Sequence, residues 1–97
     1  MANGTGTATL NFGSGGGNNE ASVAVTGQTS ITSTSKVEAF VMGEDTSTNH
    51  TANDHRYFAT LAGLSCGTPT NGTGFTIYSN SVHKLSGQFT VRWVWAD

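Results

Sequence analysis

The residues with most potential for chemistry lie in one polar segment, and five of them are carboxylates or imidazoles: Glu44, Asp45, His50, Asp54 and His55. Such side chains bind Zn²⁺ or another divalent cation when the fold brings them together. The spacing of the two histidines matches no metal signature, however, and no helix is predicted that would place two ligands on one face. We favour an exposed polar loop whose Asp and Asn side chains cap turns. A metal site and acid–base catalysis are the alternatives, and we expect no resident metal or other cofactor.

The sequence gives little support for a hydrolytic active site. Ser, His and Asp are all present, but no G-x-S-x-G motif occurs to present a nucleophile. His83 is interpreted as a surface or subunit-contact residue. The glycine-rich segment Gly13–Asn19 is not followed by the Lys and Ser/Thr that complete a phosphate-binding loop. We therefore predict a protein that is not an enzyme and has no catalytic residues.

Composition excludes further classes of function. The chain has 97 residues and a net charge of −2, which fits one domain. Its basic residues are Lys36, Arg56, Lys84 and Arg92, too scattered to follow a phosphate backbone, so nucleic-acid binding is not expected. No segment approaches the roughly 20 apolar residues of a membrane span, and the first residues lead us to expect no secretory signal. The single cysteine, Cys66, allows no internal disulfide and is expected to be a small buried thiol.

The secondary-structure signal is strand throughout. Apolar residues alternate with polar ones in short runs, and clusters of Gly, Asn, Ser and Thr separate the runs. Segment 57–66 is predicted as one bent strand or two short ones, segment 81–87 as a turn, and Asn71-Gly72 as a tight turn. Ile31 is expected to fill the core from a loop. The other strands are expected at 7–12, 21–27, 36–42, 74–80 and 87–97. Six or seven short strands predict an all-β antiparallel sandwich or jelly-roll-like domain.

The last strand carries the most apolar face of the chain. Phe89, Val91, Trp93 and Trp95 lie in phase on one side of it, and Val94 lies on the other. We predict that this strand occupies the middle of a sheet and that the four side chains form much of the core. The alternative is that the tryptophans face another subunit or a sugar. Segment 36–42 is apolar on both sides, which predicts that a neighbour covers its second face.

Two interpretations of the first residues remain open. In one, residues 1–19 form an arm with a glycine-rich hinge, and Leu10 and Phe12 reach a neighbouring subunit, while residues 20–97 form the sandwich. In the other, segment 7–12 is an ordinary strand of its own domain. The candidate subunit or ligand contacts are Leu10, Phe12, Tyr57, Tyr78, His83 and Val94.

Two functions fit this reasoning. The first is a structural protein that assembles with copies of itself, since the low proportion of charged residues lets surfaces meet without desolvating many charges. The second is a carbohydrate-binding module, with Tyr57, Tyr78 and a tryptophan as stacking surfaces. Most aromatic residues are in phase with core positions, which favours the structural interpretation.

The segments "TATLNFG", "EASVAVTGQTSI", "KVEAFVMGEDTSTNHTANDHRYF", "LSCGTPTNGTGFTIYS" and "LSGQFTVRWVWAD" span nearly the whole chain. In their order and residue patterns they resemble the small β-sandwich proteins encoded among the virion genes of tailed bacteriophages. The resemblance implies a structural component of a tail fibre, tail tip or capsid decoration, assembled in the host cytoplasm and located in the virion. Its implied partners are copies of itself, for which a trimer is our preferred form, other virion proteins and a host-surface glycan. The resemblance assigns no functional residues.

Overall fold

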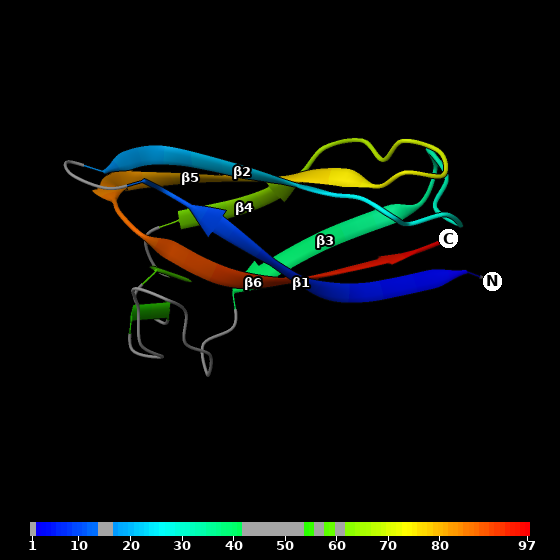
Figure 1. Cartoon of the computed structure of the whole chain (residues 1–97), viewed down its shortest axis with the longest axis horizontal. Helices are drawn as coiled ribbons and strands as arrows, with labels where there is room; N and C mark the ends of the chain where they lie inside the picture. Colours follow the sequence, from blue (N-terminus) through cyan, green and yellow to red (C-terminus); the bar gives the residue numbers. More distant parts are fainter. Residues whose placement is uncertain (1, 14–16, 42–53, 56–57, 60–61) are drawn as a thin grey trace.

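The computed structural model describes residues 2–13, 17–41, 54–55, 58–59 and 62–97. Within these residues two antiparallel three-stranded sheets pack as the layers of a β-sandwich (Figure 1). One sheet has the order β1-β6-β3 and the other the order β2-β5-β4. The strands are β1 (Asn3–Asn11), β2 (Asn18–Val25), β3 (Lys36–Val41), β4 (Ala62–Cys66), β5 (Phe75–Leu85) and β6 (Gln88–Ala96). The predicted all-β antiparallel sandwich is confirmed.

The last strand lies in the middle of its sheet, as its alternation predicts. β6 pairs with β1 along one side and with β3 along the other. Its inward side chains, Phe89, Val91, Trp93 and Trp95, are all at most 6% exposed. The predicted core role of these four residues is confirmed, and the tryptophans are therefore not surface platforms.

Small residues on β1 make room for the two indole rings. Gly4 pairs with Trp95 and Gly6 with Trp93 across the β1–β6 ladder. A Cβ atom on Gly6 would lie 2.6 Å from Trp93 Cζ2, and one on Gly4 would collide with Trp95 Nε1. Further along the same face, Ala8 lies opposite Val91, and Leu10 lies opposite Phe89. Complementary sizes across the ladder therefore fill this layer of the core.

The N-terminal segment belongs to its own domain in this structure. β1 pairs with β6 from Asn3 to Asn11, and Leu10 and Phe12 are fully buried. The Asn18 side chain also donates a hydrogen bond to the Phe12 carbonyl at 2.7 Å. This arrangement corresponds to the ordinary-strand alternative, and burial removes Leu10 and Phe12 from the candidate surface contacts.

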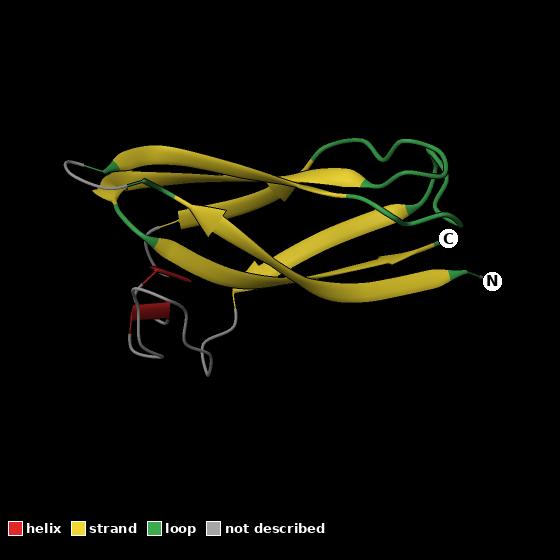
Figure 2. Cartoon of the chain, in the orientation of Figure 1, coloured by secondary structure: helices red, strands yellow, loops and turns green. Residues whose placement is uncertain are grey.

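Residues before β4 close one end of the sandwich with a local structure that the sequence analysis missed. Asp54–His55 and Phe58–Ala59 have helical backbone, where we predicted loop and then strand (Figure 2). Phe58 stacks on Phe89 with ring centroids 4.3 Å apart, and Phe12 meets both rings edge-on. The prediction of a strand starting at residue 57 is corrected, because this aromatic contact packs Phe58 into the core as part of a helical turn.

The opposite end is closed by two loops. Ile31 is 2% exposed there, as predicted, and its carbonyl accepts a hydrogen bond from the Gly72 amide at 2.9 Å. Gly72 has a φ of +70° in the predicted Asn71-Gly72 turn. A second correction concerns 81–87: β5 continues to Leu85, which pairs with Asn18 of β2, so that only Ser86 and Gly87 connect β5 to β6.

Candidate functional site

The polar cluster predicted as a loop does not form a recognisable site in the part of the chain that the structure describes. Glu44, Asp45 and His50 lie outside the described residues, and Asp54 is exposed. His55 is fully buried, contrary to the exposed loop we predicted. Among the described residues, no three His, Cys, Asp or Glu side chains gather to hold a metal ion.

His55 has a structural role that its burial explains. Its Nε2 atom accepts a hydrogen bond from the Thr90 amide at 3.1 Å, and its ring meets Phe89 edge-on at 5.4 Å. Among the described residues, the β3–β6 pairing ends at Val41 and Val91. The imidazole supplies an acceptor for the Thr90 amide just beyond that point, and this bond occupies the nitrogen lone pair that a metal ion would need.

The candidate contact residues that remain are spread over the two outer faces. Tyr57 lies outside the described residues. Tyr78 and His83 are exposed on β5, and Val94 is exposed on β6. Tyr78 and Val94 therefore mark opposite sides of the sandwich, and the structure brings no two of the described predicted contacts into one site.

The first outer face belongs to the β1-β6-β3 sheet. Phe40, which is 43% exposed, pairs with Arg92, and Glu38 pairs with Val94, which is 37% exposed. Phe40 and Val94 are therefore diagonal neighbours on adjacent strands, close enough for their side chains to form one apolar patch. We call this surface the Phe40–Val94 face. A shallow hollow of about 230 Å³ lies beside the patch, between β3 and β6.

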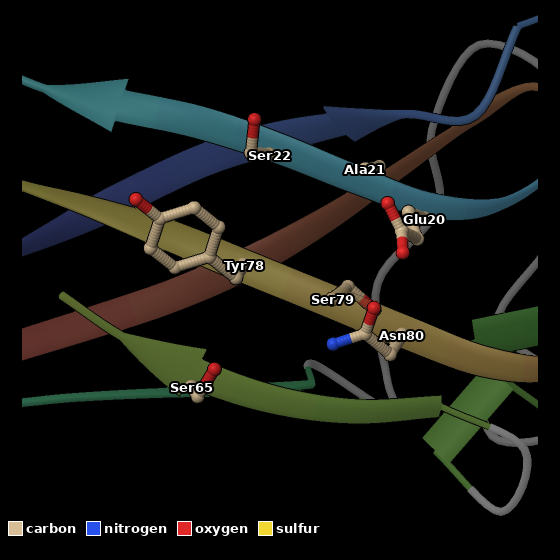
Figure 3. Close-up of a pocket in the computed structure, with 7 residues that line it drawn as sticks. All are labelled: Glu20, Ala21, Ser22, Ser65, Tyr78, Ser79 and Asn80. Carbon is tan, nitrogen blue, oxygen red and sulfur yellow. The ribbon is translucent and has the colours of Figure 1, made fainter.

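The second outer face belongs to the β2-β5-β4 sheet. Tyr78, at its centre, pairs with Ser22 of β2 and with Ser65 of β4. One row further along, Asn80 pairs with Glu20. These five residues line a shallow hollow of about 530 Å³, which we call the Tyr78 face (Figure 3).

The tyrosine ring is exposed because its neighbours are small. Tyr78 is 46% exposed, since serines are its direct partners on both adjacent strands. A Cβ atom added to Gly67 would lie 3.3 Å from Tyr78 Cε2, so the ring extends over a glycine. Figure 3 shows the ring lying along the sheet, with the serine hydroxyls on either side and the Glu20 and Asn80 side chains beyond it.

The one cysteine is not placed for nucleophilic chemistry. Cys66 is half-buried at the end of β4, and it is a free thiol. Burial raises the pKa of its thiol, and the negative charge of Glu38 raises it further. A raised pKa keeps the thiol protonated at neutral pH, and the protonated form is the unreactive one.

Sequence reasoning missed most of both faces. The sequence pattern indicates Phe40 only as part of segment 36–42 with its two apolar faces, and it does not single out Glu20, Ser22, Ser65 or Asn80. Each belongs to a different short run in the sequence, and only strand order and register make them neighbours. The one sequence signal for the Tyr78 face is the position of Tyr78 on the side of its strand opposite to the core residues Phe75 and Ile77.

No protein-family model matches the chain, and no curated protein or solved structure is significantly similar to it. None of the helical segments that the structure describes has the length and hydropathy to cross a membrane.

Proposed function

We propose that this protein is a non-enzymatic structural subunit that assembles with copies of itself through the Phe40–Val94 face. The observation that carries the proposal is that two exposed apolar side chains, Phe40 and Val94, are diagonal neighbours on one outer sheet face. Single exposed apolar residues are common on soluble proteins, whereas contiguous apolar patches mark association surfaces.

The surroundings of the patch suit contact between copies. Lys36 and Arg92 supply positive charge and Glu38 supplies negative charge on the same outer face. A two-fold or cyclic contact can therefore place opposite charges against each other around an apolar centre. Along β1, Thr5, Thr7 and Thr9 are exposed, and uncharged hydroxyls cost less to desolvate than ionised groups.

The setting we propose for this assembly is the virion of a tailed bacteriophage. The support is the sequence resemblance, together with a small sandwich whose core is completed within the chain. The partners are then copies of this chain, with a trimer as our preferred form, and other virion proteins of the tail or capsid surface.

The test is the oligomeric state of the full chain. Light scattering from about 10 µM to 500 µM should show a defined oligomer, and a Phe40→Ser/Val94→Ser double variant should be monomeric over the same range. Tyr78→Ser removes an equally exposed aromatic ring from the opposite face and should leave the oligomer intact. A monomeric wild-type protein at the highest concentration contradicts self-assembly.

The virion setting needs its own measurement. Particles purified from a lysate of cells that carry the gene should contain the protein in fixed stoichiometry, as measured by quantitative mass spectrometry. Its absence from such particles refutes the virion role and leaves the solution oligomer as a separate result.

A further inference from the structure

We propose that the Tyr78 face is a binding site for a neutral sugar, in which a pyranose ring stacks on Tyr78 and its hydroxyls bond to the polar side chains around it. This inference does not depend on the proposed assembly, because the Tyr78 face lies on the opposite sheet from the Phe40–Val94 face. It assigns a ligand class to residues that the proposed function does not use.

The stacking surface is built by the neighbours of Tyr78. The serine on each adjacent strand is too small to cover the ring, and Gly67 leaves space beneath its outer edge. The ring is thus accessible over its face, as Figure 3 shows from the side of the outer sheet surface. An aromatic face is electron-rich and attracts the positive C–H groups on the apolar side of a pyranose.

Hydrogen-bonding groups lie at the distances that one sugar or two linked sugars would need. Tyr78 and Asn80 are two residues apart on β5, a separation of about 6.6 Å, and adjacent strands are about 4.8 Å apart. Asn80 offers both a donor and an acceptor, Glu20 offers acceptors, and Ser22 and Ser65 offer hydroxyls. Ligand sites are commonly built from an aromatic or apolar surface and a few polar groups, and the polar groups fix the orientation of the bound ligand.

Charge determines which sugars fit. Among the described residues that line the hollow, Glu20 is the only charged side chain. Its carboxylate accepts hydroxyl hydrogens but repels a sugar carboxylate or phosphate, and no cation of that lining offsets it. The site therefore favours neutral hexoses and disfavours acidic sugars.

A second copy of the chain fits this face less well than a sugar does. Tyr78 is the only large apolar side chain among the described residues of the lining, and the remainder is small or polar. A protein–protein contact depends on a larger apolar centre, such as the one on the opposite face. A single stacked sugar, by contrast, needs one ring, and weak binding at each site becomes strong when several copies present it together.

The experiment is a titration of the ¹⁵N-labelled full chain followed by two-dimensional ¹H–¹⁵N NMR. The probes are methyl β-glucoside, methyl β-galactoside and N-acetylglucosamine, each to about 50 mM, with glucuronic acid as the charged comparison. At least one neutral probe should give saturable shifts confined to β2, β5 and β4, with a dissociation constant in the millimolar range expected for a ligand of this size. Glucuronic acid should bind at least tenfold more weakly.

Variants separate the parts of the site. Tyr78→Ala should weaken binding at least tenfold, Tyr78→Phe should retain most of it, and Glu20→Gln should improve binding of glucuronic acid. Phe40→Ser, on the opposite face, should bind the neutral probe as the wild type does, even where it alters the oligomer. Unchanged NMR dispersion in each variant shows that the fold is retained.

Three results overturn the proposal. One is the absence of saturable shifts with every neutral probe, and another is unchanged affinity in Tyr78→Ala. The third is shifts on β2, β5 and β4 that depend on protein concentration rather than on sugar, which would identify this face as a contact between copies. The first two results leave the assembly test at Phe40 and Val94 unaffected.

Discussion

Gly6 provides the sharpest test of how the core is built. Its position opposite Trp93 leaves no space for a side chain, since an added Cβ would lie 2.6 Å from Trp93 Cζ2 and 3.0 Å from Cε2. The indole cannot easily move away. It is 6% exposed, its Nε1 donates to the Thr7 carbonyl at 3.3 Å, and its ring meets Phe75 edge-on. Gly6→Ala must therefore displace either the ring or the strand.

The expected cost follows from two opposing terms. Overpacking a well-filled core costs about 1–3 kcal/mol. Replacing a strand glycine with alanine recovers about 0.5–1 kcal/mol, because the unfolded chain loses conformational freedom. The net loss of unfolding free energy is then about 0–2.5 kcal/mol, with a central value of about 1.3 kcal/mol. For a domain of this size the central value corresponds to a fall in Tm of roughly 5–10 °C.

The assay is urea denaturation followed by circular dichroism and tryptophan fluorescence. Gly63→Ala is the matched control, because Gly63 also lies in a strand, has no positive φ and would have no atom of the described residues within 4 Å of its Cβ. This control should be neutral or stabilising by up to about 1 kcal/mol. The difference between the two glycines isolates the steric term from the intrinsic preference of alanine for a strand.

A double-mutant cycle identifies the partner. Trp93→Phe removes the benzo ring that contains Cζ2, so Gly6→Ala should cost at least about 1 kcal/mol less in that background than in the wild type. Two results would refute the packing of the indole against β1. One is a Gly6→Ala variant as stable as Gly63→Ala, and the other is a cost of Gly6→Ala that is the same in the Trp93→Phe background as in the wild type.

Three further outcomes are expected. Phe89→Ala should cost about 3–5 kcal/mol, because Phe89 is 3% exposed and stacks on Phe58; a loss below about 1 kcal/mol in the denaturation midpoint analysis would contradict that core position. His55→Ala should cost about 1–3 kcal/mol by leaving the Thr90 amide unpaired, whereas His83→Ala, on an exposed histidine, should change stability by less than about 0.5 kcal/mol; equal effects would disprove the role of the imidazole. Cys66 has a raised pKa in the folded protein, so its contribution to stability is complete below the unfolded thiol pKa of about 8.5 and is lost as pH rises above that value. Iodoacetamide should therefore alkylate Cys66 at pH 8 more slowly than it alkylates a free-cysteine peptide. The Cys66→Ala variant should lose less stability at alkaline pH than the wild type does. An alkylation rate equal to that of the peptide would show that the thiol is not protected.

Alternation along the chain was enough to predict the main features of the fold. The in-phase residues Phe89, Val91, Trp93 and Trp95 predicted a buried central strand, and β6 is that strand. The period of two is a local property of extended backbone, so it can be read without knowing what the strand packs against. The same applies to Asn71-Gly72, where the turn requires the positive φ that glycine supplies.

Tertiary structure decided the features that depend on partners distant in sequence. Gly4 and Gly6 look like flexible residues until the β1–β6 register places them opposite the indoles. Phe58 and His55 lie in a polar stretch with no helical periodicity, and their burial comes from contacts with Phe89 and with the Thr90 amide of β6.

Both outer faces depend on register in the same way. Phe40 and Val94 become neighbours only through the β3–β6 ladder, and Tyr78 acquires its serine neighbours only through pairing with β2 and β4. Local sequence specifies which side of a strand a residue occupies, whereas the neighbours of that residue are set by which strands pair and at what offset. That pairing is determined by the packing of the whole core, since a shift of one residue would turn every buried side chain outward.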